Sequence, residues 1–277
     1  MRLKNRLHFK ISKQFYFSRI KNLFSFHAIL SKIKPVFGNE FPKNKERVVL
    51  FDNLEYTMPS FTLTRELVEH GIPFTVCSSL SSLNRALGKQ NVIFIGISCY
   101  YSNIKAVENI IKIYYQRVPL VFGGPQALQY MDFGICCNEA GEDAIIQLDS
   151  YFRKKIEKNE IYNIQYKENG IVKNNIYKPV DFSIRTPIIR WPYLLLSRGC
   201  SSNCAFCWFS LSSKLGLNLY DLDFKKIHKL LNQYINECLK NRRRSIICDT
   251  TVTPKHKEIL EYINKKGVGV FFNLKLQ

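Results

Sequence analysis

Three cysteines with a tight spacing are the residues of this chain best suited to chemistry. Cys200, Cys204 and Cys207 form the pattern C-x3-C-x2-C, directly after an apolar run, Tyr193–Leu196, that is typical of a buried strand. Thiolates at this spacing can converge on one metal centre from a single loop at the end of a strand. Three ligands are one fewer than a structural zinc ion or a ferredoxin-type cluster takes. A three-cysteine iron–sulfur site leaves one iron open to a substrate or cofactor.

The cysteine pattern on a loop after a strand, with the aromatic Phe206 just before the last cysteine, resembles the radical S-adenosylmethionine superfamily. The resemblance implies that Cys200, Cys204 and Cys207 hold a 4Fe-4S cluster whose remaining iron binds the amino and carboxylate groups of S-adenosylmethionine. It also implies that the reduced cluster splits the sulfonium and that a 5′-deoxyadenosyl radical then abstracts a hydrogen from a substrate. In that family the cofactor performs the difficult chemistry and the protein positions it and excludes water.

The same resemblance implies further contacts to S-adenosylmethionine. Phe206 is expected to help place the adenine moiety. Asp249 and Thr250 follow the next expected strand and match a strand-end position that contacts S-adenosylmethionine in the family. The Gly-Gly-Glu sequence that is common in the family is absent from this chain.

A zinc site is the alternative interpretation of the cysteine triplet. Zinc would require a fourth ligand, and the nearby candidates are Cys238, Cys248, His228 and His256. None of them stands at a standard zinc-finger spacing from the triplet. Gly, Ser and Asn residues around the cysteines indicate an exposed turn rather than a core. The pattern therefore favours a cluster over zinc and over coincidental core cysteines.

Composition indicates a globular protein with room for two modest domains. The chain has 277 residues, 46% of them hydrophobic, and no apolar run reaches the length of a membrane span. No leader with a charged start, an apolar centre and a small-residue cleavage site is evident. The nine cysteines, an odd number that includes a metal-type triplet, fit a reducing interior better than a disulfide framework. We therefore expect a cytoplasmic location.

The net charge of +19 is concentrated partly at the N-terminus, where residues 1–47 contain twelve Lys or Arg and two acidic residues. Apolar positions at helical spacing within residues 1–34 predict a basic amphipathic helical arm, followed by a linker to residue 46. Such a segment can lie on a membrane surface, serve as a targeting leader, or pack on the protein itself, and the last is favoured. The charge elsewhere is diffuse, which disfavours nucleic acid as a partner.

Residues 47–153 alternate short apolar runs with helical patterns, which predicts a doubly wound parallel α/β sheet of Rossmann-like type. Ligands of such sheets bind beyond the carboxyl ends of the strands. The expected strands are Arg47–Asp52, Phe74–Cys77, Val92–Cys99, Leu120–Phe122 and Ile135–Cys137, and the expected helices are Ser60–His70, Leu80–Leu87, Ile104–Arg117 and Asp143–Arg153.

Three strand-end sequences, Gly96–Asn103, Val121–Pro125 and Glu139–Asp143, resemble in order those of cobalamin-binding-type Rossmann-like domains, which often precede a radical S-adenosylmethionine barrel. Glycines allow close approach of backbone to a ligand, and a strand-end hydroxyl is available to a nucleotide tail. Simple turn geometry is the alternative explanation for each glycine. The cofactor-binding candidates in this domain are Ser98, Gly123, Gly124, Gly141 and Glu142.

One departure from the cobalamin pattern is the absence of Asp-x-His-x-x-Gly after the first strand. The corresponding stretch, Asp52–Thr57, contains no histidine. The one histidine of this domain, His70, lies at an expected helix end, where the helix dipole explains it. Cobalamin therefore remains a candidate cofactor without a histidine ligand, and retention of the fold alone is the alternative.

Residues 154–190 predict a linking β-hairpin, because Asn169-Gly170 separates two alternating runs. Residues 191–277 predict the N-terminal half of a radical S-adenosylmethionine (β/α) barrel. Its expected elements are strand Tyr193–Ser197, helix Asp223–Lys240, strand Ser245–Cys248, helix Pro254–Lys266 and strand Val268–Leu274.

The sequence as a whole indicates a radical S-adenosylmethionine iron–sulfur protein acting on a substrate that no motif identifies. A metal- or cluster-binding module without turnover and a degenerate remnant are the alternatives. The expected partners are an electron donor such as flavodoxin or ferredoxin and a second chain that completes the barrel. Since the third strand of the half-barrel would leave an open sheet edge, we expect this chain alone to be marginally stable, prone to associate and poor at cleaving S-adenosylmethionine.

Overall fold

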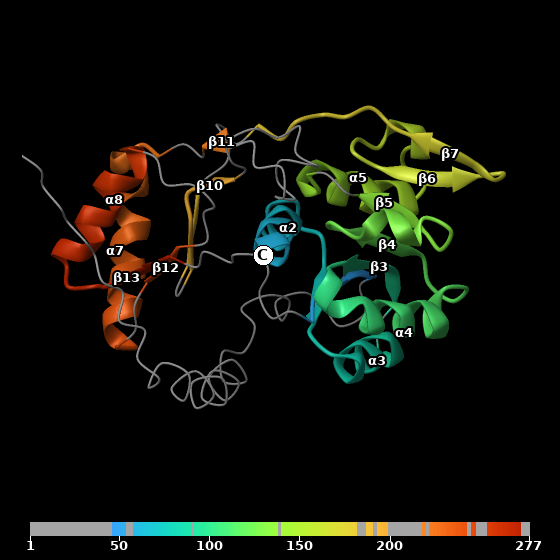
Figure 1. Cartoon of the computed structure of the whole chain (residues 1–277), viewed down its shortest axis with the longest axis horizontal. Helices are drawn as coiled ribbons and strands as arrows, with labels where there is room; N and C mark the ends of the chain where they lie inside the picture. The colour runs from blue at the N-terminus through green and yellow to red at the C-terminus, as the bar shows by residue number, and fades with distance from the viewer. Residues whose placement is uncertain are drawn as a thin grey trace, which may run out of the picture. The chain divides into compact units, whose positions relative to one another are not determined.

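The computed structural model describes residues 46–53, 58–89, 91–137, 140–181, 187–190, 193–198, 218–219, 222–242, 245–247 and 254–272. The basic N-terminal arm expected over residues 1–34 therefore lies outside the described residues, as does the expected linker up to residue 45. The described residues form two β-sheets with helices, and each sheet is treated by itself below (Figure 1). No helix among them is long and apolar enough to cross a membrane.

The first sheet has seven strands in the order β2-β1-β3-β4-β5-β6-β7. Pairing is parallel from β2 through β5, and the last two strands join antiparallel. The strands are β1 (Arg47–Phe51), β2 (Phe74–Cys77), β3 (Val92–Ser98), β4 (Leu120–Gly123), β5 (Ile135–Cys137), β6 (Gln165–Glu168) and β7 (Ile171–Asn174). The chain runs outward from β1 in one direction to β2 and in the other to β3, so the strand order reverses between β1 and β3.

Helices cover both faces of this sheet, as the alternation of strands and helices predicted (Figure 1). The helices are α2 (Met58–Glu69), α3 (Leu80–Lys89), α4 (Ile104–Tyr114) and α5 (Glu142–Phe152), with short 3₁₀ turns η1 (Tyr101–Asn103), η2 (Ala127–Tyr130) and η3 (Lys158–Glu160). Helices α3 and α4 share one core with the sheet, whereas α2 and α5 pack against each other. The doubly wound α/β class is therefore confirmed.

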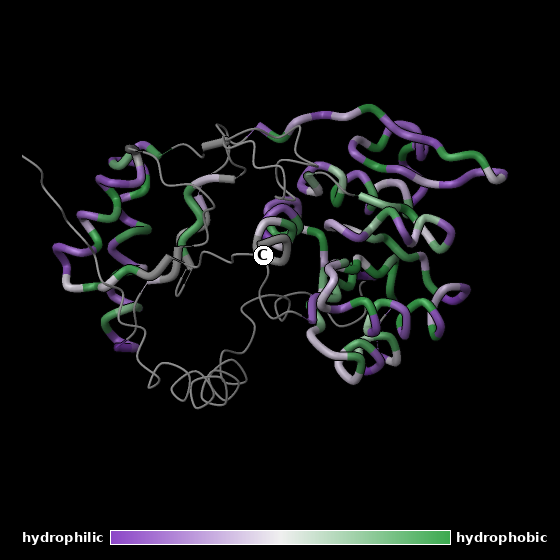
Figure 2. The backbone as a smooth tube through the Cα atoms, viewed as in Figure 1, coloured by the Kyte–Doolittle hydropathy of each residue, from purple (hydrophilic) through white to green (hydrophobic). Residues whose placement is uncertain are grey.

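The strand sequences explain why two helical layers are required. All five residues of β1 are buried, so both faces of this central strand must be covered. Val49, Phe51 and Ile95 belong to the core shared with α3 and α4. Phe94 faces the other way, and its ring centroid lies 5.2 Å from that of Phe152 in α5. Burial of each such large apolar side chain contributes about 1.5–3 kcal/mol to the free energy of folding. In Figure 2 the central strands are largely hydrophobic along their length, whereas the helices alternate hydrophobic and hydrophilic residues.

The hairpin predicted from Asn169-Gly170 forms, and both residues have positive φ angles, 51° and 78°. This conformation is the one that a two-residue turn between right-twisted strands requires. The hairpin also adds two strands to the sheet, because Gln165 of β6 pairs with Cys136 of β5. The sequence pattern did not predict that addition.

The second sheet has the order β13-β12-β9-β8. Strands β9 (Tyr193–Leu195), β12 (Ser245–Ile247) and β13 (Val270–Phe272) are parallel, and β8 (Ile188–Arg190) joins β9 antiparallel. Helices α7 (Phe224–Lys240) and α8 (Pro254–Lys265) pack on it around a core that includes Leu194, Leu231 and Ile263. Asp223 begins α7 by accepting a hydrogen bond from the Lys225 backbone at 3.0 Å. These parallel strands with intervening helices agree with the predicted partial (β/α) barrel.

Two short strands were not predicted from the sequence. Strand β8 lies between Pro187 and Pro192, at the end of the linking segment of residues 154–190. Strand β11 (Asn218–Leu219) pairs antiparallel with β10 (Ser197–Arg198), which immediately precedes the cysteine loop. Both depend on partners elsewhere in the chain, and neither has a sequence long enough to show a period.

Candidate functional site

The carboxyl edge of the seven-stranded sheet brings together candidates that are separate in the sequence. Ser98 at the end of β3 pairs with Gly123 of β4, and Gly123 pairs in turn with Cys137 of β5. The loops that follow these strands therefore begin side by side. Ser98 is half-buried at this edge.

The three candidate glycines differ in what their local packing demands. Gly124 has a φ of +93°, and a Cβ there would lie 3.0 Å from the carbonyl oxygen of Cys99. Gly141 would place a Cβ 3.2 Å from the side chain of Leu63 in α2. Gly123 would meet nothing closer than 3.6 Å, an ordinary contact. Turn geometry and packing thus account for Gly124 and Gly141, while Gly123 has no comparable constraint among the described residues.

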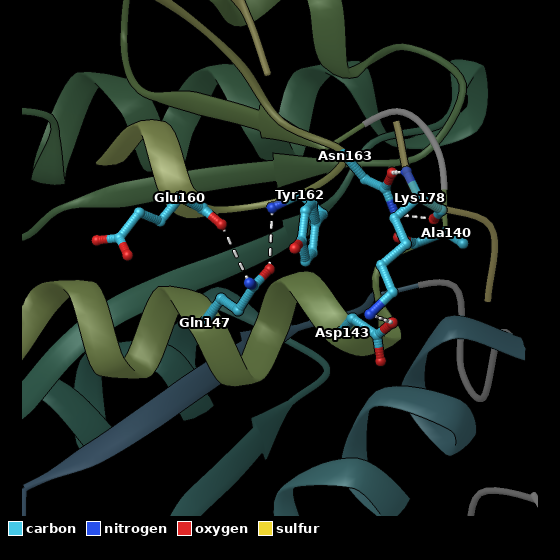
Figure 3. Close-up of polar contacts among 7 residues, drawn as sticks. All are labelled: Ala140, Asp143, Gln147, Glu160, Tyr162, Asn163 and Lys178. Carbon is cyan, nitrogen blue, oxygen red and sulfur yellow. Dashed lines mark hydrogen bonds and ion pairs between the residues drawn. The ribbon is translucent and has the colours of Figure 1, made fainter. Parts of the chain in front are cut away.

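Glu142 occupies the first turn of α5 and is fully buried. A carboxylate at this position interacts favourably with the positive end of the helix dipole. Asn163, which lies two residues before β6, anchors the loop just before Glu142. Its side-chain NH₂ donates to the carbonyl oxygens of Ala140, at 3.1 Å, and Lys178, at 2.9 Å, and its oxygen accepts from the Lys178 backbone at 2.8 Å (Figure 3).

Helix α5 is fastened to the same segment by Gln147. Its NH₂ donates to the carbonyl of Glu160 at 3.1 Å, and its oxygen accepts from the Tyr162 backbone at 2.9 Å (Figure 3). Asn163 itself has a φ of 62°, a conformation that Asn tolerates better than most residues. The third strand-end loop, which includes Gly141 and Glu142, is therefore held by polar contacts to the segments that flank the hairpin.

A depression of about 530 Å³ opens at the reversal of strand order between β1 and β3. It is lined by Asn53, Tyr101, Ser102, Asn103, Ile104, Lys105 and Ala106. Asn103 is 2% exposed, and its NH₂ donates to the Ser98 carbonyl at 2.6 Å and to the Asn53 side-chain oxygen at 2.9 Å. Sheets of this order bind ligands at this point. Asn53 and Asn103 were not among the predicted site residues.

His70 does not lie at this edge. It follows α2 and precedes β2, and its ring Nδ1 is 2.9 Å from the backbone oxygen of Glu66, at the end of α2. It lines a different depression, with Glu46, Asp149 and Arg153, beside the start of β1. The helix-end role predicted for His70 agrees with this geometry, and Asn53 occupies the start of the loop after β1.

The cysteine triplet and its companions fall outside the described residues: Cys200, Cys204, Phe206, Cys207, Asp249 and Thr250. The structure describes the strands that lead to them. Strands β9 and β12 are parallel neighbours, with Tyr193 paired to Ile246 and Leu194 to Ile247. The chain therefore leaves both strands at the same edge of the second sheet.

The described residues contain no group of three or more His, Cys, Asp or Glu side chains that is arranged to hold a metal ion. Among the zinc-ligand candidates, Cys238 is a residue of α7 that lies in the core of the second sheet, and His256 of α8 is fully buried. His228 is exposed and its Nε2 is 3.0 Å from the Tyr262 hydroxyl. Cys248 lies outside the described residues.

Burial shifts the pKa of four core cysteines upward, which favours the protonated thiol at neutral pH. Burial raises the pKa of Cys77 and of Cys238 from 9.0 to about 11, and that of Cys136 to about 12. Burial raises the pKa of Cys99 as well. Metal binding requires the thiolate, so these four residues are poor ligands.

Comparison with solved structures identifies the fold. The cobalamin-dependent S-adenosylmethionine radical enzyme OxsB, solved with aqua-cobalamin and S-adenosylmethionine bound, matches with a TM-score of 0.65 at 17% identity over 82% of this chain. The radical S-adenosylmethionine methyltransferase TsrM from Kitasatospora setae, solved with tryptophan and a S-adenosylmethionine analogue, matches with a TM-score of 0.62 at 14% identity over 80% of this chain. A second TsrM structure, with a TM-score of 0.60, holds cobalamin and a [4Fe-4S] cluster.

The chain thus shares the fold of cobalamin-dependent radical S-adenosylmethionine enzymes, and the resemblance inferred from its cysteine pattern is confirmed at the level of the fold. The chain spans 38% of the length of OxsB and 51% of that of TsrM. No family model matches the sequence. No curated protein matches it either.

Proposed function

We propose that this chain is a radical S-adenosylmethionine iron–sulfur protein that also binds a cobalamin-type cofactor. The observation that carries the proposal is the combination of the C-x3-C-x2-C sequence after β9 and β10 with a fold shared, over most of the chain, with enzymes of that class. The fold alone would not identify an activity. The three cysteines of the sequence supply metal ligands, which no group of three or more His, Cys, Asp or Glu side chains is arranged to do within the described part of the chain.

In this proposal Cys200, Cys204 and Cys207 ligate a 4Fe-4S cluster, which supplies electron transfer to S-adenosylmethionine when bound. Phe206 packs on the adenine, and the carboxylate of Asp249 and the hydroxyl of Thr250 bind the amino group or ribose. Support comes from the topology, because the residues after β9 and after β12 leave the sheet at one edge. Three thiolates leave one iron free, which fits a cofactor with its own amino and carboxylate ligands.

The cobalamin-type cofactor is proposed for the carboxyl edge of the seven-stranded sheet. Ser98 would donate a hydrogen bond from its hydroxyl to the cofactor. Gly123 would allow the cofactor to approach the backbone of β4. Gly124 and Gly141 would shape the two following loops, and Glu142 would support the second of them from α5. The fit rests on the aligned ends of β3, β4 and β5 and on the half-buried Ser98 among them.

Two other functions remain as alternatives: a cluster-binding module without turnover, and a remnant that retains only the fold. An electron donor such as flavodoxin or ferredoxin, a second chain that completes the barrel, and a cytoplasmic location all belong to the proposal. Zinc in place of the cluster is disfavoured because two of the four candidate fourth ligands, Cys238 and His256, are fully buried.

Anaerobic reconstitution with iron and sulfide, followed by addition of S-adenosylmethionine, tests the catalytic proposal. We expect the electron paramagnetic resonance spectrum of the dithionite-reduced cluster to change when S-adenosylmethionine is added, because the open iron gains two ligands. Because the chain alone is expected to cleave S-adenosylmethionine poorly, we expect a small amount of 5′-deoxyadenosine in the wild-type reaction and none with Cys200→Ala. A fully loaded cluster that does not respond to S-adenosylmethionine would instead identify a binding module.

A second expected result concerns the lower face of bound cobalamin. Because Asp52 and Asn53 follow β1 and His70 lies beside the opposite ends of the strands, no histidine of this domain is expected to coordinate cobalt. The spectrum of the cob(II)alamin form should therefore lack coupling to a histidine nitrogen. His70→Ala should leave that spectrum unchanged, and a change in it would contradict the assignment.

A further inference from the structure

Asn103 is a buried side chain that links the loop after β3 to the loop after β1. Its oxygen accepts a hydrogen bond from the Tyr100 backbone at 2.8 Å. Its NH₂ group donates to the Ser98 carbonyl at 2.6 Å and to the Asn53 side chain at 2.9 Å. The first two bonds lie within one loop, whereas the third joins residues fifty positions apart in the chain.

The orientation of both amides follows from the backbone groups that they meet. The Tyr100 N–H can only donate, so the side-chain atom of Asn103 that faces it is oxygen. The Ser98 carbonyl can only accept, so the other end of Asn103 is NH₂. The second N–H of that group then requires an acceptor on Asn53, which is its side-chain oxygen. Two backbone groups thus determine which way Asn53 points.

This orientation determines what Asn53 offers to a ligand. With its oxygen engaged by Asn103, the group of Asn53 that is directed away from Asn103 is NH₂, a neutral donor. Asn53 is half-buried and lines the depression of about 530 Å³ together with Tyr101, Ser102 and Lys105. The depression lies where the strand order reverses, and Asn53 follows the first strand at that point.

We propose that Asn53 is a binding residue that donates a hydrogen bond from its NH₂ to an oxygen of the cobalamin-type cofactor, and that Asn103 is the positioning residue that orients it. This inference rests on the cofactor proposed above. The accepting oxygen has two sources in cobalamin, the carboxamide groups around the corrin ring and the phosphate of the nucleotide tail. Both accept from a neutral amide, and neither requires a charged partner.

A purely structural role for Asn103 would predict something different. The bonds to Tyr100 and Ser98 would suffice to shape the loop before α4, and substitution of Asn53 would then leave ligand binding unchanged. In the proposed arrangement, Asn103→Asp keeps the acceptor for Tyr100 but removes both donors. Asn53 would then turn its NH₂ toward the new carboxylate, and the depression would lose its donor.

Three variants of the full chain separate these possibilities: Asn53→Ala, Asn103→Asp and the double variant. Hydroxocobalamin binding is measured by absorbance titration, with thermal unfolding of each variant as the check on folding. We expect each single variant to weaken binding about tenfold, the loss of one hydrogen bond in a buried setting. The double variant should be no weaker than the weaker single variant, because Asn103 acts through Asn53.

Asn109→Asp is the matched control, since Asn109 is exposed on α4 and lies outside the depression. It should bind like the wild type. Repeating the titrations with cobinamide, which lacks the nucleotide tail, identifies the oxygen: losses with both ligands indicate a corrin carboxamide, and a loss with cobalamin alone indicates the phosphate.

Wild-type affinity in folded Asn53→Ala, or effects of Asn53→Ala and Asn103→Asp that add, would overturn the inference while leaving the proposed function intact. Absence of cobalamin binding by the wild type would overturn both, so the two failures can be told apart.

Discussion

Replacing any one of Cys200, Cys204 or Cys207 with Ala is expected to reduce the iron and sulfide content of the reconstituted chain to roughly one tenth or less of the wild-type value. Loss of one cysteine leaves two protein thiolates for four irons, so exogenous thiols should extract the cluster during purification. Iron and acid-labile sulfide are measured after gel filtration, together with the absorbance of the cluster near its visible maximum.

Cys238→Ala provides the matched control. Cys238 lies in the second core, its thiol is protonated at neutral pH, and its replacement removes a buried sulfur without removing a ligand. We expect this variant to lose some stability, about 1–3 kcal/mol, and to keep its iron. The same retention is expected for variants of Cys77, Cys99, Cys136, Cys137 and Cys248. Zinc as the stoichiometric metal of the wild type, or iron loss in Cys238→Ala with the fold intact, would contradict the assignment.

The sequence predicted the architecture of the first sheet well because its signals are local. Each apolar run is short, and each intervening helix has its own period, as in α4, where Val107, Ile110, Ile111 and Tyr114 are buried. The hairpin turn was equally local, since Asn169 and Gly170 both tolerate positive φ. Parallel pairing and the two helical layers then follow from connection length and handedness.

What the sequence did not reveal depends on contacts between distant residues. The attachment of β6 to β5 rests on one pair, Cys136 and Gln165, which no local pattern encodes. Strand β8 is flanked by prolines that resemble a linker. Asn53 and Asn103 are ordinary turn residues in the sequence, and only the folded chain brings their amides to 2.9 Å. Polar residues directly after β1 and β3 are the one signal that could have drawn attention to them.

Gly134→Ala is expected to be the most destabilising single-methyl addition in the seven-stranded sheet. Gly134 precedes β5, and a Cβ at this position would overlap the carbonyl oxygen of Leu120 in β4 and lie 3.0 Å from its carbonyl carbon. The obstacle is backbone in a central strand, so the two strands must separate. We expect a loss of about 3 kcal/mol in the free energy of unfolding, at the upper end of overpacking effects.

Gly88→Ala is the opposite case and serves as the control for Gly134→Ala. Gly88 is exposed near the end of α3, and a Cβ there would meet nothing within 4 Å. Its replacement should stabilise the chain by about 0.5 kcal/mol through helix propensity.

Amide hydrogen exchange measured by mass spectrometry reports on the first sheet directly. In Gly134→Ala we expect faster exchange in peptides that cover β4 and β5 and little change in those that cover α7 and α8, because the clash is confined to one strand pair. The loop at Ala140 and Gly141 should lose protection as well, since it follows β5 and is anchored to the hairpin by Asn163. Unchanged protection across β4 and β5 would mean that the strand pair accommodates the methyl group and would contradict the predicted clash.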